Sequence, residues 1–204
     1  MMDFFALLGE PRRPWSDPDA LKTKFLSLSA QIHPDRMHGA TPEAQKTAQE
    51  QFTELNAAYQ CLREPRDRLK HLVELETGRR PQDLQNIEPE LMGFFMEVTR
   101  LCREADDFHA SASKADSPLL RVRQFQEAQE LTEHLRGMQD AISSRNSGLL
   151  KELKTLDEKW DSSTHGGAGE REALVGQIQR LSHLFGFCAR WSAQVQERIV
   201  QLAV

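Results

Sequence analysis

The chain has 204 residues, of which 28% are charged, and its formal net charge is −5. The length and a mean hydropathy of −0.59 predict a soluble protein of one or two domains, and no apolar run approaches the roughly 20 residues of a membrane-spanning helix. The 26 lysine and arginine residues are spread along the chain, which argues against a nucleic-acid-binding surface. The first residues lack the basic segment of a signal peptide, so we expect a cytoplasmic protein.

The pattern of apolar residues over residues 17–62 predicts two amphipathic helices. From residue 17, an Asp-Pro start signal is followed by apolar residues at every third or fourth position. This first helix must end at His33, because the proline that follows excludes the α conformation from the residue before it. A Thr-Pro signal at residue 41 starts a second helix of the same period, which continues to Leu62. The two apolar stripes would face one another in an antiparallel hairpin.

The polar loop of this hairpin carries the tripeptide His33-Pro34-Asp35. By itself the tripeptide is an ordinary turn sequence, since proline and aspartate are common in turns. Here it lies between two facing helices, and short apolar helices are expected over residues 4–9 and 65–75 to cover them. That arrangement is typical of a J-domain.

Residues 3–78 resemble J-domains. The segment 52–62, Phe-Thr-Glu-Leu-Asn-Ala-Ala-Tyr-Gln-Cys-Leu, is similar to one subgroup, the HscB family of co-chaperones in iron-sulfur cluster assembly. The resemblance implies that the loop binds a chaperone ATPase of the DnaK or HscA class and stimulates its ATP hydrolysis, while the J-domain itself performs no chemistry. J-domains usually carry a basic face before the tripeptide, and here it is sparse. The implied chaperone-binding residues are His33, Pro34, Asp35, Lys22, Lys24 and Arg36.

The rest of the chain predicts a linker over residues 79–88 and then three helices. Apolar steps of three and four residues in the two longer helices are typical of a bundle or a coiled coil, and the seam of the middle helix is expected to begin at Phe125. The sequence therefore predicts an all-α protein, with a J-domain over residues 1–78 and a three-helix bundle with long helices over residues 89–204. The first expected helix covers residues 90–109, and the apolar seams of the second and third expected helices run over residues 125–160 and 174–202.

The helix expected over residues 90–109 has more apolar residues than its core face requires. At roughly 100° per residue, Met92 and Met96 lie far from that face and Phe95 lies on its border. Phe187 in the last helix is likewise off its seam. Exposed thioethers and aromatic rings are common where a protein binds another protein. The alternative is that the start of this helix packs on the J-domain.

The run Phe-Phe-Met-Glu-Val at residues 94–98 also resembles the C-terminal domain of the HscB family, where an IscU scaffold protein binds exposed leucine, methionine and phenylalanine. The resemblance implies an IscU-like partner, with Phe185 or Phe187 contributing from the last helix. Thr99 stands where the family has an apolar residue. The implied scaffold-binding residues are Met92, Phe95, Met96, Thr99, Phe185 and Phe187.

Nothing in the sequence indicates a catalytic, metal or cofactor site. Cys61, Cys102 and Cys188 are isolated, as expected of reduced, packed thiols, and neither C-x-x-C nor H-E-x-x-H occurs. We therefore expect an activator of a partner's ATPase rather than an enzyme. Two alternatives are a J-domain co-chaperone for another client and a structural coiled-coil protein with a degenerate J-domain. The long helices also leave self-association open.

Overall fold

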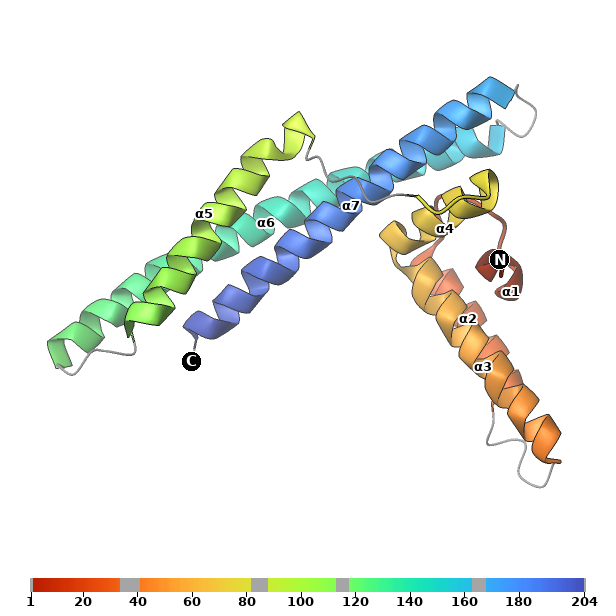
Figure 1. Ribbon diagram of the computed structural model, residues 1–204, viewed down its shortest axis with the longest axis horizontal. Helices are drawn as coiled ribbons and strands as arrows, with labels where there is room; N and C mark the ends of the chain where they lie inside the picture. Colours follow the sequence, from red (N-terminus) through yellow and green to blue (C-terminus); the bar gives the residue numbers. More distant parts are fainter. Residues whose placement is uncertain (1, 34–40, 82–87, 113–117, 163–167, 204) are drawn as a thin grey trace. The chain divides into compact units, whose positions relative to one another are not determined.

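The structure, a computed structural model, describes residues 2–33, 41–81, 88–112, 118–162 and 168–203, and its regular secondary structure there consists of helices alone. The predicted all-α class is confirmed (Figure 1). In chain order the helices are α1 (Phe4–Leu7), α2 (Pro18–Ile32), α3 (Pro42–Arg63), α4 (Pro65–Thr77), α5 (Pro89–Ala112), α6 (Pro118–Ser162) and α7 (Ala168–Leu202).

The helix starts follow the predicted signals, since proline is the first residue of α2 and α3. The Asp17 carboxylate accepts hydrogen bonds from the backbone N–H groups of Asp19 and Ala20, at 3.0 and 2.9 Å. The Thr41 hydroxyl accepts one from the N–H of Ala44 at 3.3 Å. These bonds satisfy N–H groups that the first turn of a helix leaves without partners.

The described chain forms two compact units. Unit 1 combines residues 1–82 with 151–183, and unit 2 combines residues 83–150 with 184–204. Helices α1 to α4 therefore share unit 1 with the end of α6 and the start of α7. The division expected at residues 79–88 stays a prediction.

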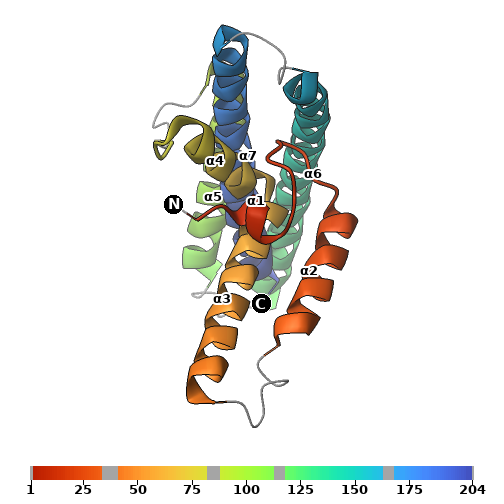
Figure 2. The same ribbon diagram turned by 90° about the vertical axis from the view of Figure 1, so that its right-hand side faces the viewer.

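In unit 1, α2 and α3 form the predicted antiparallel hairpin, and α1 and α4 pack against α3 (Figure 2). Residues 8–17, called the connecting segment below, join α1 to α2 without helical structure beyond the α1 cap. The Phe25 and Tyr59 rings stack 4.2 Å apart between α2 and α3. The largest fully buried side chains of this unit include Phe5, Leu8, Leu21, Leu62, Leu69, Leu72 and Leu153.

Side chains from α6 hold the connecting segment in place. The Trp160 indole N–H donates to the backbone carbonyl of Arg12 at 2.9 Å. The buried Asp157 carboxylate accepts the backbone N–H of Trp15 at 2.9 Å and also pairs with the Arg13 guanidinium. Backbone groups outside regular structure require such partners when they are removed from water.

The α4 side of the connecting segment is held by Arg68. Its buried guanidinium donates to the carbonyl oxygens of Pro14 at 2.8 Å and Leu62 at 2.6 Å. Burial lowers the pKa of Arg68 to about 10, so the group remains charged at neutral pH.

In unit 2, α5 packs with parts of α6 and α7, which confirms the predicted three-helix bundle. The rings of Phe94 on α5 and Trp191 on α7 lie parallel at 6.2 Å. Gln139 on α6 donates to Gln196 on α7 at 2.9 Å. Buried apolar side chains of this unit include Leu91, Val98, Leu101, Leu135, Ile142, Leu149, Leu184, Cys188 and Val195.

One expectation about α6 is wrong. Phe125, expected to begin the buried seam, is 71% exposed, because α7 ends before reaching it. Gln196 lies beside Gln139, so Leu202, six residues later on the antiparallel α7, lies near Glu133, six residues earlier on α6. Phe125 is eight residues further, about 12 Å at the helical rise of 1.5 Å per residue. Figure 1 shows α6 extending past the end of α7.

Candidate functional site

His33 lies directly after the last residue of α2, at the loop end of the hairpin. Its backbone is extended, with φ −61° and ψ 129°, as expected for a residue before proline. The half-buried ring meets Phe52 of α3 edge-on, with centroids 5.2 Å apart. His33 is therefore oriented by both helices of the hairpin. Pro34, Asp35 and Arg36, also expected in the chaperone-binding site, lie outside the described residues.

The two lysines expected to bind a chaperone are in different environments. Lys22 is exposed on α2. The Lys24 ammonium donates to the Gly9 carbonyl at 2.6 Å and forms an ion pair with Glu10 at 2.7 Å. Lys24 thus holds the connecting segment, and Lys22 is available to a partner. Glu10 was missed in the sequence, because nothing local indicates that residues 14 positions apart would meet.

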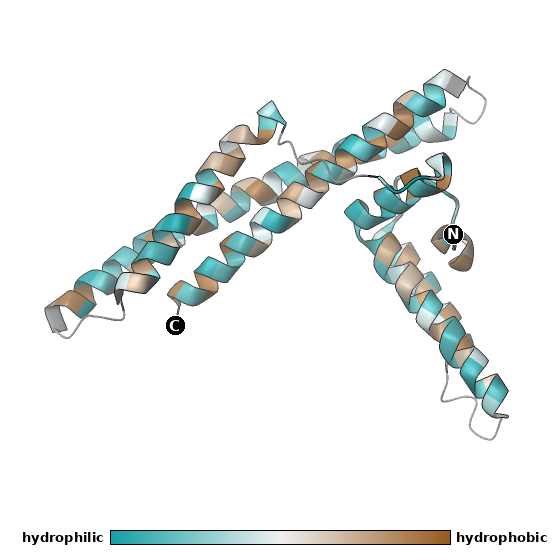
Figure 3. Cartoon of the chain, in the orientation of Figure 1, coloured by the Kyte–Doolittle hydropathy of each residue, from teal (hydrophilic) through white to brown (hydrophobic). Residues whose placement is uncertain are grey.

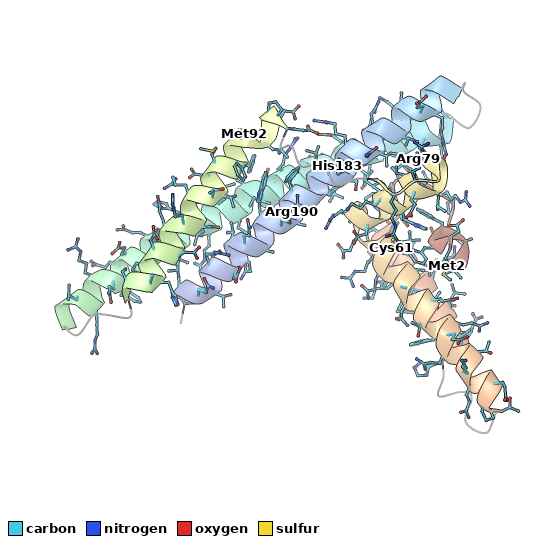
Figure 4. The ribbon with its side chains drawn as sticks, viewed as in Figure 1. Met2, Cys61, Arg79, Met92, His183 and Arg190 are labelled. Carbon is cyan, nitrogen blue, oxygen red and sulfur yellow. The ribbon has the colours of Figure 1, made fainter. Side chains whose placement is uncertain are left out.

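A surface on α5 carries four of the expected scaffold-binding residues. Met92 and Met96 are 45% and 63% exposed, Phe95 is half-buried and Thr99 is exposed. Their spacing of three and four residues places them on one side of α5, near its start, where Figure 4 labels Met92. The Thr99 hydroxyl donates to the Phe95 carbonyl at 2.7 Å, which leaves its methyl group as the apolar part. Met92, Phe95, Met96 and Thr99 are called the α5 surface below.

The two phenylalanines expected from α7 are buried, Phe185 at 4% and Phe187 at 8% exposure. The interpretation of Phe187 as off its seam is wrong, because α7 has a second apolar stripe. Leu184, Phe187 and Trp191 are three and four residues apart and all buried, and Trp191 stacks on Phe94 of α5. That spacing was the signal available in the sequence. Neither phenylalanine adds to the exposed area of the α5 surface.

No metal-binding group is found among the described side chains, where histidine, cysteine, aspartate and glutamate nowhere gather in threes suited to an ion. Burial raises the pKa of Cys61 to about 12 and raises the pKa values of Cys102 and Cys188 as well. Thiols with raised pKa values are weak nucleophiles at neutral pH. Within the described ranges, no helix is both long and apolar enough to cross a membrane.

Comparison with known proteins assigns the N-terminal helices. Residues 3–71 match the model of the DnaJ domain family. The hairpin with His33 at its loop end, covered by α1 and α4, is thus a J-domain, as the sequence predicted.

The fold of nearly the whole chain is that of HscB. Chaperone HscB from Vibrio cholerae is similar over 98% of this chain and 99% of its own, with a TM-score of 0.63 and 20% identity. Human co-chaperone protein HscB is similar over 98% of this chain and 81% of its own, with a TM-score of 0.60 and 13% identity. The chain is therefore a J-domain protein with the HscB fold, which confirms the resemblance noted in its sequence.

Proposed function

We propose that this protein is a co-chaperone that brings an iron-sulfur scaffold protein to a DnaK-class ATPase and stimulates ATP hydrolysis by that ATPase. The J-domain contacts the ATPase, and the α5 surface binds the scaffold. The observation that carries the proposal is the position of His33, held between α2 and α3 at the loop end of a J-domain.

His33 is suited to this role because its position is largely fixed before binding. The ring is supported by Phe52 and the backbone by the end of α2, so little side-chain freedom is lost when a partner is bound. Pro34 restricts the loop backbone, Asp35 supplies an acceptor for the ATPase, and Lys22 adds a cation on the exposed face of α2.

The α5 surface is suited to bind a protein rather than a small molecule. Met92 and Met96 extend from a regular helix, and flexible thioethers adapt to the shape of a partner. Phe95 and the methyl group of Thr99 add further apolar area to the same side of α5. The J-domain and the α5 surface belong to one chain, so scaffold binding raises the local concentration of the scaffold beside the ATPase.

The decisive measurement is single-turnover ATP hydrolysis by a purified DnaK-class ATPase with full-length protein. We expect His33→Gln to abolish stimulation. The edge contact with Phe52 contributes about 0.5–1.5 kcal/mol, so the melting temperature should fall by only a few degrees. The control is His109→Gln, the same change at an exposed histidine of α5, which should stimulate like the wild type. Equal stimulation by both variants would show that the loop is not the trigger.

Scaffold binding is measured separately by titration calorimetry with a purified IscU-like scaffold. We expect Phe95→Ala with Met96→Ala to weaken binding more than about tenfold, because each anchor contributes above about 1 kcal/mol and 1.4 kcal/mol is one decade in affinity. Val200→Ala removes apolar area from an exposed valine of α7 and should bind normally. Unchanged affinity of the double variant would place the scaffold elsewhere.

A further inference from the structure

One side of α2 carries an exposed leucine close to His33. Leu26 is 54% exposed, whereas Leu21 of the same helix is 1% exposed. The neighbouring Phe25 is packed against the ring of Tyr59. Figure 3 shows hydrophobic residues among hydrophilic ones along the hairpin of α2 and α3. Single exposed leucines are common on protein surfaces, so the role of Leu26 depends on which residues share its side of the helix.

Leu26 lies on the same side of α2 as Lys22 and His33. At about 100° per residue, residues 22, 26 and 33 are within about 40° of one another around the helix axis. His33 follows this period although it ends the helix, because its φ of −61° is still helical and places its side chain as in a helix. At the helical rise of 1.5 Å per residue, Leu26 is about 6 Å along the axis from Lys22 and about 10 Å from His33. A partner that contacts both Lys22 and His33 therefore covers Leu26.

Charge contributes little to this side of α2. Lys22 is exposed, but so is Asp19, which lies three residues earlier and about 60° away around the axis. The third charged side chain of α2, Lys24, is held by the connecting segment. From there to His33 the sequence has no charged residue, and Leu26 is the largest exposed apolar side chain of α2. An attraction based on charge alone would therefore be weak and would be screened by salt.

We propose that Leu26 is a docking residue for the DnaK-class ATPase and that it selects ATPases with an apolar side chain at the position opposite it. The inference rests on the proposed function, in which the ATPase contacts His33 and Lys22. Leu26 lies between these two contacts, so the surrounding polar contacts shield it from water, as is typical of the residues that dominate an interface. A carboxylate at the opposite position would lose its water without gaining a hydrogen bond from leucine, so an acidic ATPase surface would bind less tightly.

The test is single-turnover ATP hydrolysis by a purified DnaK-class ATPase titrated with full-length protein, which yields a half-maximal concentration and a maximal rate. Leu26→Gln introduces a residue that favours helices, but it replaces apolar area with an amide. We expect the half-maximal concentration to rise about tenfold and the maximal rate to stay unchanged, because His33 is intact. The control is Leu120→Gln, the same change at a 48% exposed leucine of α6, which should match the wild type.

Two further changes at residue 26 test the chemistry of the contact. Leu26→Met keeps the apolar area and nearly the volume, so the half-maximal concentration should stay within about twofold of the wild-type value. Leu26→Lys adds a cation that an acidic surface would attract and an apolar surface would not, so it should weaken binding at least as much as Leu26→Gln. The weakening by Leu26→Gln should be the same at low and high salt, whereas the weakening by Lys22→Ala should shrink as salt is added.

The role of Leu26 can fail while the proposed function holds. If Leu26→Gln matches the wild type while His33→Gln abolishes stimulation, the loop is the trigger and Leu26 has no part in docking. Tighter binding by Leu26→Lys, or equal losses in Leu26→Met and Leu26→Gln, would show that apolar contact does not select the partner. A lower maximal rate without a change in the half-maximal concentration would assign Leu26 to the trigger instead of to docking. Absence of stimulation by the wild type would overturn the proposed function and the role of Leu26 together.

Discussion

Unit 1 and unit 2 are each stabilised internally, by different kinds of contact. In unit 1, side chains make directional bonds to the backbone of the connecting segment, as Trp160 does to Arg12, Asp157 to Trp15 and Arg68 to Pro14. In unit 2, apolar stripes of three helices face one another, and the ion pairs between helices are partly exposed.

The difference follows from the backbone that each unit must bury. A helix satisfies its own N–H and C=O groups, so apolar stripes are enough to pack one helix on another. The connecting segment has no such internal bonds and must find donors and acceptors on its neighbours. The connecting segment is consequently tied to the end of α6 by directional contacts. Removing a single partner in unit 1 should therefore cost more than removing one in unit 2.

Asp157→Ala should give the largest effect, a loss of about 3 kcal/mol in the free energy of unfolding of unit 1. The change leaves the Trp15 N–H without its acceptor and Arg13 without a buried partner. The value is at the low end for a buried pair, because Arg13 keeps about a third of its side chain in water. Urea unfolding followed by tryptophan fluorescence measures it in a Trp191→Phe background, since Trp15 and Trp160 lie in unit 1 and Trp191 lies in unit 2.

The matched control is Asp161→Ala. Asp161 also pairs with Arg13, at 3.2 Å, but its own side chain is exposed, so the loss should stay below about 0.5 kcal/mol. If both variants lost the same free energy of unfolding, burial would not explain the difference expected between Asp157 and Asp161. The explanation of unit 1 by directional bonds to buried backbone would then be wrong.

Local signals in the sequence predicted the helices because local bonds form them. The start of α2 was predictable from Asp17, whose carboxylate caps the next turn, and α3 from Thr41 in the same way. The contacts of the connecting segment were not predictable, since Trp160 is 148 residues from Arg12. Phe125 was wrongly predicted to lie in the core, because the apolar period of α6 gives no information on where α7 ends.

Lys24→Ala and Lys22→Ala compare a lysine used within unit 1 with one available to a partner. Lys24→Ala removes the donor to Gly9 and Glu10, and we expect a loss of about 1 kcal/mol in the free energy of unfolding. Lys22→Ala should leave stability unchanged and lower the affinity for the DnaK-class ATPase, measured by titration at low salt. The opposite assignment of the two effects would place the chaperone contact on Lys24.

The α5 surface was predictable from the sequence because the period of a single helix decides on which side of it a residue lies. Met92 and Met96 lie on the side of α5 away from its own core face, and a 100° rotation per residue is enough to place them there. Phe187 was misplaced because α7 packs on both α6 and α5. Its burial is explained by the packing on α5, where Phe94 stacks on Trp191 and Trp191 contacts Phe187.

A smaller effect is expected from pH, through His71. Its Nε2 accepts the backbone N–H of Phe4 at 3.1 Å, and burial lowers its pKa below 6.5. As pH falls through 6.5, the unfolded chain binds the proton before the folded one, so the free energy of unfolding decreases from there down to the folded pKa. His71→Phe should lack this part of the pH dependence. Melting curves of both proteins between pH 8 and pH 5 measure the difference, and parallel curves would exclude His71 as its source.

The smallest effect should come from Arg100→Gln in unit 2. Arg100 lies 2.6 Å from both Glu97 and Glu104, closer than Lys24 lies to Glu10 in unit 1, at 2.7 Å. The hydrogen bond to Arg100 lowers the pKa of Glu97, but all three side chains are about half exposed. In water the attraction is weak, and ordering three long side chains offsets it. We therefore expect no measurable change in melting temperature, in contrast to Asp157→Ala. If Arg100→Gln and Asp157→Ala lowered the melting temperature by similar amounts, the distance between the charges would decide what an ion pair contributes to stability. Burial of the charges and of the backbone groups that they bond would then have no effect.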